Sequence, residues 1–189
     1  MNKKILVEVS ARHLHLSAAD AAELFGADHD WQILKTLSQP GEVAYQDKVS
    51  LLGPNGQSLT ARVLGPWRQA TQVELAASDA AALGLTAPVK LSGDHAGSAG
   101  LTLQGPTGTV TLTQGVILAK RHLHISPSEA GELGLRQGQL VRVKIDNRHI
   151  IDEIVVRLGE RYRLALHLDT DEAKAAGLER RPLEGELLN

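Results

Sequence analysis

The sequence contains no cysteine among its 189 residues. This absence excludes disulfide bonds, thiolate zinc sites and any covalent catalysis through a thiol. A metal ion would have to be held by His, Asp or Glu side chains. Aromatic residues are also scarce, at 3%, so the core must be built from Val, Leu, Ile and Ala.

Long runs of one chemical character are missing as well. No stretch approaches the ~20 apolar residues that span a bilayer, and no long basic run suits duplex nucleic acid. Two lysines precede the apolar stretch 5–9, but Glu8 interrupts it, so this stretch predicts a first strand rather than a signal peptide. With a net charge of −2, we expect a cytoplasmic protein that binds neither membranes nor nucleic acid.

An internal repeat is the strongest pattern that is present. Residues 10–24 read SARHLHLSAADAAEL and residues 119–133 read AKRHLHISPSEAGEL. Each copy has Arg-His-Leu-His, then a Ser at which a helix can begin, then an acidic residue three positions later. A match of this length indicates that a structural unit has been duplicated.

The rest of the chain reads as short strands separated by turn signals. Gly-Pro-x-Gly turns at 53–56 and 105–108 lie between segments that alternate as half-buried strands do. Residues 146–148 indicate another hairpin turn, and the Gly- and Ser-rich segment 92–98 an exposed loop. With four short helices, the expected fold class is mostly β, built from small barrels rather than a doubly wound sheet.

The histidines of the two repeats are the main candidates for chemistry. Because residues i and i+2 of an extended strand point to the same side, both imidazoles of a His-Leu-His can reach one ion or two neighbouring ions. Leu14 and Leu123 then point into a core. We expect both pairs to converge on one transition-metal site in an enzyme; the alternative is two structural histidine clusters held by backbone carbonyls. The residues concerned are His13, His15, His122 and His124.

Three further residues have two interpretations each. His167 lies in an apolar strand, as a buried structural histidine or as a metal ligand that Asp169 could support. Glu74 needs a partner such as a metal if it faces inward, and is ordinary if it faces outward. Arg68 follows a Gly-Pro turn, as an anion-binding fork or as a surface arginine. The histidines in polar loops or turns are expected at the surface: His29, His95 and His149.

A ligand set of five nitrogens and one carboxylate has a clear metal preference. It suits zinc or another late divalent metal, and it is too rich in nitrogen for magnesium or calcium. Six ligands suit two ions better than one. Such ions can act as Lewis acids, stabilise a thiolate or alkoxide leaving group and orient an anion.

Six motifs occur in an order that resembles one known family. They are VSARHLHLS at 9–17, LSQPG at 37–41, VLGP at 63–66, TQVE at 71–74, AKRHLH at 119–124 and LHLDTDEA at 166–173. Together they cover nearly the whole chain. They resemble the PduL-type phosphotransacylases, also called phosphate propanoyltransferases.

The resemblance implies the reaction acyl-CoA + phosphate ⇌ acyl phosphate + CoA, with two zinc ions per chain. His13, His15 and Glu74 would hold one ion, whose fourth place the CoA sulfur can take. A second group of three would hold the other ion, and Arg68 would contact phosphate as the catalytic arginine. That second group is His122, His124 and His167. The positions that would contact CoA are Ser10, Ala11, Arg12, Arg62 and Lys174.

The resemblance also implies a domain organisation. It consists of two small β-barrels capped by short α-helices and related by internal duplication. One barrel would combine residues 1–11 with 119–189, and the other would span 12–118, with a two-stranded lid near 44–56. Because family members in microcompartments have an N-terminal helical extension and the first strand here begins almost at Met1, the resemblance favours a free cytoplasmic enzyme. Such an enzyme would make acyl phosphate for ATP synthesis through a kinase.

Two departures from the family's pattern affect the CoA contacts. Asn55 stands where relatives often have Lys, and Lys174 stands where some have Asn. Two other functions stay open, namely a di-zinc hydrolase of thioesters or phosphoesters and a non-catalytic metal-stabilised binding module. So do the native metal, a homodimer, and acetyl against propanoyl as substrate, since one methylene is worth only about 1–3 kcal/mol in a pocket.

Overall fold

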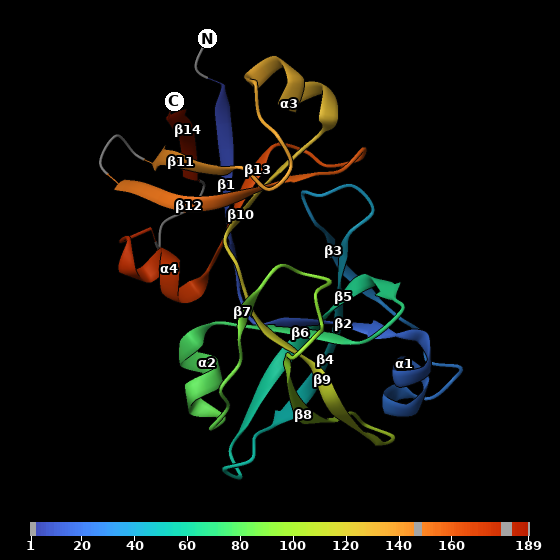
Figure 1. Cartoon of the computed structure of the whole chain (residues 1–189). Helices are drawn as coiled ribbons and strands as arrows, with labels where there is room; N and C mark the ends of the chain where they lie inside the picture. Colours follow the sequence, from blue (N-terminus) through green and yellow to red (C-terminus); the bar gives the residue numbers. More distant parts are fainter. Residues whose placement is uncertain (1–2, 146–148, 179–182, 189) are drawn as a thin grey trace. The chain divides into compact units, whose positions relative to one another are not determined.

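The chain divides into two compact units. Unit 1 comprises Met1–Ser10 with Lys120–Asn189, and unit 2 comprises Ala11–Ala119. Each unit is built mainly of short strands (Figure 1). Among the helices that the structure describes, none has the length and apolar character that a membrane span requires. This computed structural model describes residues 3–145, 149–178 and 183–188.

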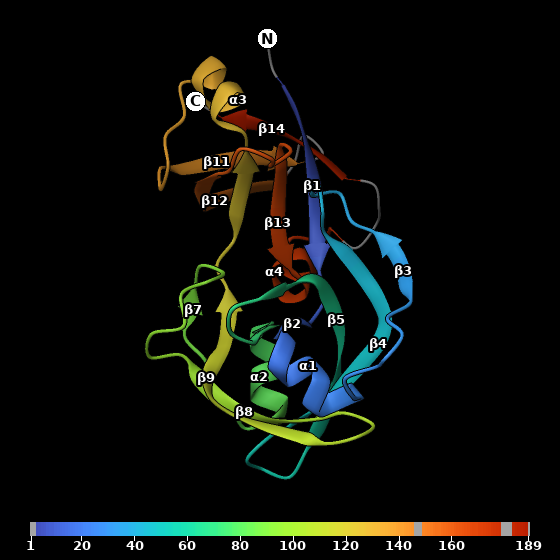
Figure 2. The same cartoon turned by 90° about the vertical axis from the view of Figure 1, so that its right-hand side faces the viewer.

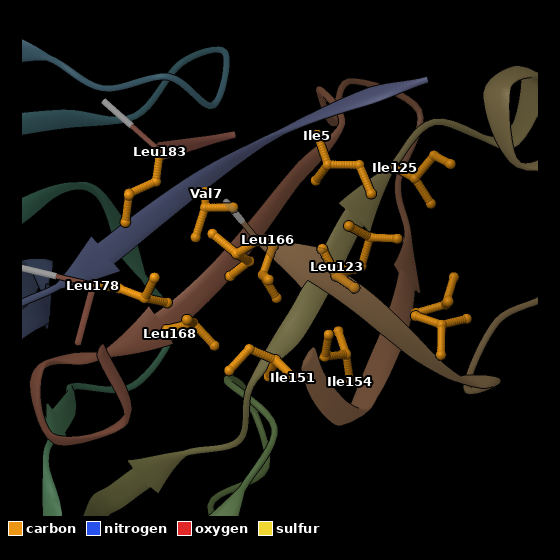
Figure 3. Packing of buried hydrophobic residues seen from close by; sticks show 14 of the residues in the cluster. Ile5, Val7, Leu123, Ile125, Ile151, Ile154, Leu166, Leu168, Leu178 and Leu183 are labelled. Carbon is orange, nitrogen blue, oxygen red and sulfur yellow. The ribbon is translucent and has the colours of Figure 1, made fainter. Parts of the chain in front are cut away.

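The described residues of unit 1 form six strands and two short helices. They are β1 Lys4–Ser10, β10 His122–Ile125, β11 Leu140–Ile145, β12 His149–Leu158, β13 Ala165–Asp169, β14 Leu183–Leu188, α3 Pro127–Leu133 and α4 Thr170–Ala175. The strands form a closed barrel in the order β1-β13-β10-β12-β11-β14. β1 closes the ring because it pairs parallel with β13 and antiparallel with β14 (Figure 2). The barrel is filled by aliphatic side chains such as Val7, Leu123 and Leu166 (Figure 3).

Unit 2 contains a second closed barrel. Its elements are β2 His13–Ser17, α1 Ala18–Phe25, β3 Ile33–Thr36, β4 Val43–Leu52, β5 Ser58–Arg68, β6 Gln72–Leu75, α2 Ala77–Ala82, β7 Val89–Lys90, β8 Ala99–Gln104 and β9 Thr109–Ala119. The order β4-β5-β2-β6-β9 becomes a ring of six because β8 pairs with both β4 and β9. β3 and β7 extend this sheet at β4 and β9. The expected mostly-β fold with two helix-capped barrels is confirmed.

The two barrels have the same strand pairing. β2 is parallel to β5 and antiparallel to β6, and β10 is likewise parallel to β12 and antiparallel to β13. β9 occupies in unit 2 the place that β1 occupies in unit 1. Each pairs in parallel with the strand that is antiparallel to the His-Leu-His strand, β9 with β6 and β1 with β13. The strand that precedes each His-Leu-His copy is therefore exchanged between the repeats, and blue β1 stands among orange and red strands in Figure 1.

The helices begin where their caps predict. The hydroxyl of Ser17 accepts a hydrogen bond from the backbone of Asp20, and that of Ser126 from the backbone of Glu129. Pro127 occupies the first turn of α3, where its missing N–H costs nothing. Asp169 caps α4 by accepting a hydrogen bond from the backbone of Glu172 at 2.7 Å.

Both Gly-Pro-x-Gly turns pack against helix ends in unit 2. A Cβ on Gly53 would lie 2.1 Å from the carbonyl oxygen of Leu83, and one on Gly105 would lie 2.2 Å from that of Leu24. Only glycine permits this approach. The amide of Asn55 then donates to the carbonyl of Ala82 at 3.0 Å and satisfies the end of α2.

One expected segment differs in the structure. Residues 44–56 were expected to form a lid, but β4 residues 48–52 pair with β5 on one side and in part with β8 on the other. They belong to the barrel wall because Val49 and Leu51 are buried in its core. The strand that lies outside the barrel ring in this region is β3, which pairs with β4 at the edge of the sheet. The hairpin turn expected at 146–148 lies outside the described residues.

Candidate metal centres

Strand register places a third side chain opposite the first histidine of each His-Leu-His. In unit 2, His13 of β2 is paired with Glu74 of β6. In unit 1, His122 of β10 is paired with His167 of β13. Directly paired residues have neighbouring Cβ atoms on the same face of the sheet. The two repeats thus build the same arrangement, with a carboxylate in one and an imidazole in the other.

Each arrangement is compact enough for one metal ion. The ligand atoms of His13, His15 and Glu74, here called the first triad, all lie within 4.8 Å of one another. The same holds for the second triad, which consists of His122, His124 and His167. As predicted, the intervening leucines point the other way and are fully buried in the two cores: Leu14 and Leu123.

The first histidine of each pair is oriented by its own backbone. Nδ1 of His13 donates to the carbonyl of Ala11, and Nδ1 of His122 donates to the carbonyl of Lys120, both at 2.9 Å. A neutral imidazole that donates through Nδ1 presents Nε2 as a lone-pair donor. Such backbone contacts fix the tautomer in metal-bound histidines, so the two copies share this feature of a metal site.

The second histidines are buried with unsatisfied ring nitrogens. Among the described residues, neither Nδ1 nor Nε2 of His124 has a hydrogen-bond partner, and Nδ1 of His15 has none. Burial, with Arg68 and His13, lowers the pKa of His15 to about 3. Burial, with His122 and His167, also lowers the pKa of His124. These rings are neutral at neutral pH, which is the form that binds a metal, and the donor sets of both triads fit a zinc ion.

A hydrogen-bond network holds Glu74 in place. Its Oε1 accepts from the Gln72 amide at 2.5 Å and from the Ser92 hydroxyl at 2.7 Å, while its Oε2 lies 3.6 Å from Nε2 of His13. Burial alone would raise the pKa of Glu74, but the neighbouring His13 and the Ser92 hydrogen bond outweigh it and lower the pKa. Glu74 is therefore an ionised, buried carboxylate that faces inward, as a metal ligand requires.

The segment 92–98 contributes to this network. The backbone of Gly93 donates to the side-chain oxygen of Gln72 at 2.7 Å, and Nε2 of His95 donates to the same oxygen at 3.0 Å. The segment is an exposed loop as expected, but His95 is half-buried because the buried Gln72 anchors it. His29 is also less exposed than expected, since it packs on Phe25 and lies 3.0 Å from Asp47.

Arg68 lies beside the first triad, at the end of β5. Its guanidinium donates to the hydroxyl of Ser92 at 2.8 Å, and Ser92 in turn donates to Glu74. The adjacent Trp67 belongs to an aromatic cluster that fixes this end of the strand. The cluster holds four of the chain's five aromatic side chains, Phe25, Trp31, Tyr45 and Trp67. A guanidinium held in this way is suited to bind an anion.

The expected CoA positions have contacts of their own. Arg12 forms a 2.5 Å ion pair with the buried Asp79 at α2 and also donates to the carbonyl of Thr60. Arg62 donates to the carbonyls of Tyr45 and Gln46. Ser10 and Ala11 lie where β1 ends and β2 approaches, and Lys174 lies exposed on α4.

Comparison with known proteins gives a consistent result. A family model described as phosphate propanoyltransferase matches residues 6–179. A phosphate propanoyltransferase of Shewanella putrefaciens is 47% identical over 94% of this chain and 85% of that protein. Proteins of the same description from Thermotoga maritima and Klebsiella pneumoniae are 43% and 44% identical, over 92% and 93% of this chain and 84% of each relative.

These matches define the class of the protein. With two six-stranded barrels and a histidine-rich cluster in each, the chain is an enzyme of the phosphate acyltransferase class. It belongs to the phosphate propanoyltransferase family.

Proposed function

We propose that this enzyme transfers a short acyl group between CoA and inorganic phosphate, with a divalent metal ion, zinc by its donor set, in each triad. One observation supports it above the others. In each unit the strand antiparallel to the His-Leu-His strand places a third ligand-type side chain at the same register position, Glu74 on β6 and His167 on β13. Folding of the two barrels does not require these buried imidazoles, and burying a ring nitrogen without a partner costs free energy.

In the transfer, a phosphate oxygen attacks the carbonyl carbon of the thioester. The carbon–sulfur bond breaks, CoA leaves as a thiolate with the bonding electron pair, and acyl phosphate is formed. The ions in the triads would supply Lewis-acid chemistry that stabilises the thiolate and the phosphate charge. No acyl-enzyme through a thiol can form, because the chain has no cysteine.

The protein groups have distinct parts in this reaction. Arg68 binds phosphate through its planar guanidinium and aims one oxygen at the carbonyl. Ser92 and Gln72 hold Glu74 so that one carboxylate oxygen stays directed at His13. The CoA positions, which include Arg62 and Lys174, would bind the nucleotide portion of CoA. Arg12 would do so as well, in addition to its ion pair with Asp79 at α2.

An assay of CoA release tests this function. Metal-analysed protein is given acetyl-CoA or propanoyl-CoA, with and without phosphate. The proposal predicts that CoA release requires phosphate and that acyl phosphate accumulates in equal amount. Release of free acid without phosphate would instead identify a thioester hydrolase and overturn the proposal. Arg68→Lys should raise the phosphate KM and lower kcat, because Lys cannot form the planar double contact.

A further inference from the structure

In each barrel, one further strand lies beside the strand that carries the third residue of the triad. In unit 2, β9 lies beside β6 and pairs Ile117 with Glu74. In unit 1, β1 lies beside β13 and pairs Glu8 with His167. Because β1 and β9 occupy equivalent places, Glu8 and Ile117 are equivalent residues of the two repeats. Their preceding neighbours, Val7 and Val116, are both core residues.

The two sheet faces that carry the triads therefore each have one carboxylate, but the carboxylate lies on a different strand in each. The first consists of two histidines, the carboxylate Glu74 and the apolar Ile117. The second consists of three histidines and the carboxylate Glu8. Each face holds one carboxylate. In the second face the third ligand position is an imidazole, and the carboxylate lies one strand further along, on β1.

The distances match this reading. Oε2 of Glu8 lies 3.7 Å from Nε2 of His167, and Oε2 of Glu74 lies 3.6 Å from Nε2 of His13. Both separations are longer than an N–H···O hydrogen bond of about 2.9 Å and near the ~3.4 Å between two ligands of a tetrahedral zinc ion. The side chain of Glu8 is 28% exposed, so its charge is only partly screened by water.

Positive charge on the other side of the second triad makes a carboxylate more useful there. Arg157 of β12 is paired with His124 of β10, and its charge contributes to the lowered pKa of His124. Three imidazoles carry no negative charge and cannot offset an arginine and a divalent ion. Glu74 provides such an offset within the first triad.

We propose that Glu8 supplies the negative charge that the all-histidine triad lacks, and thereby strengthens the binding of a divalent metal ion by His122, His124 and His167. The inference rests on the proposed function, because it requires an ion in the second triad. The proposal also gives the strand exchange a role. β1 precedes the first His-Leu-His copy in the sequence but places Glu8 beside the second triad.

Zinc titration against a competing chelator tests this inference. The full chain carries His13→Ala and His15→Ala, which disable the first triad and leave one equivalent at the second. Glu8→Gln is then added, which keeps the shape of the side chain and removes its charge. The matched control is Glu184→Gln, an exposed glutamate of the neighbouring β14 that pairs with Lys4. Glu8→Asp retains the charge, and thermal unfolding of the metal-free variants monitors folding.

The expected result is a zinc dissociation constant raised about 10- to 100-fold by Glu8→Gln and not by Glu184→Gln, with a smaller change for Glu8→Asp. The melting temperature of the metal-free protein should not change. Equal zinc affinity in Glu8→Gln and its parent would overturn the role of Glu8 alone. A parent that binds no zinc would overturn both this inference and the metal site of the proposed function.

Discussion

At the scale of single residues, the amide of Gln72 connects the first triad to the segment 92–98. It donates to Glu74 and to Ser92 and accepts from Gly93 and His95. Its exposed fraction is 0%. A carboxylate whose second oxygen is held in this way would lose little freedom on binding a metal. In the proposed site, Gln72 would therefore position Glu74 without contacting the ion.

We predict that Gln72→Leu, which keeps the volume and removes the hydrogen bonds, lowers the free energy of unfolding by about 1–3 kcal/mol. It should also weaken zinc binding at the first triad by about 10- to 100-fold. Urea unfolding and chelator competition measure the two effects, with the exposed Gln57→Leu as control. Unchanged zinc affinity in Gln72→Leu would show that Glu74 needs no such support.

Arg12 gives a second test at this scale, because its expected contact with CoA and its observed ion pair predict different results. Without CoA, Arg12→Gln should lower the free energy of unfolding by about 1–3 kcal/mol, since it leaves the buried Asp79 without its cation. Lys174→Gln, at an exposed CoA position, should change it by less than about 0.5 kcal/mol. Equal stability of Arg12→Gln and the wild type would show that the ion pair with Asp79 does not stabilise the fold, and would leave CoA binding as the role of Arg12.

The residues that form the two triads could be predicted from the sequence, whereas those that support them could not. His13 and His122 stand out because two copies of a rare pattern share one register. Gln72, Ser92 and His95 have common polar side chains, and their role depends on a loop folding back over β6. Only the Thr-Gln-Val-Glu motif, which places Gln72 two residues before Glu74, gave a signal that could have found one of them.

At the scale of elements, α3 shows how a local signal sets a helix start. Ser126 and Glu129 form reciprocal hydrogen bonds, and Lys3 of unit 1 adds an ion pair to Glu129 at 2.8 Å. The hydrogen bond from Lys3 is the largest cause that lowers the pKa of Glu129 from its ordinary value of 4.5, against partial burial. All partners of the cap lie within four residues, so the sequence alone predicts it.

The pH dependence of this contact follows from the direction of the shift. Because the folded pKa is lowered, the extra stability is present above 4.5 and is lost as the pH falls through the folded value. We predict that Glu129→Gln, which retains the cap, costs about 0.2–1 kcal/mol near neutral pH. The difference should vanish in acid, as urea unfolding over a pH series would show. A difference that persists below the folded pKa would mean that packing, not charge, is responsible.

At the scale of the whole molecule, the exchange of β1 and β9 was not evident from strand patterning. Residues 5–9 and 113–119 are both apolar strands that precede a His-Leu-His, so either could pair with its own repeat. Only the resemblance to a known family indicated that the first strand joins the C-terminal part. Contacts across more than a hundred residues choose between such equivalent partners, and local patterns do not report them.

The exchange predicts different behaviour for two segments of the chain. Residues 11–119 contain all six strands of one barrel and should fold alone. Residues 120–189 lack β1, so β13 and β14 have no shared neighbour, and this segment should show no cooperative thermal unfolding by circular dichroism. Joining residues 1–10 to it through a flexible linker should restore a transition. Cooperative unfolding of 120–189 without β1 would contradict the assignment of that strand.

The most direct measurement of the central claim is phosphate-dependent CoA release while zinc is added to metal-free protein. The account predicts negligible release at the start and a rise that ends at two zinc ions per chain. With His122→Ala and His124→Ala, only one zinc ion should bind and release should stay negligible. Full phosphate-dependent turnover by the metal-free protein, or by this double variant, would contradict the account.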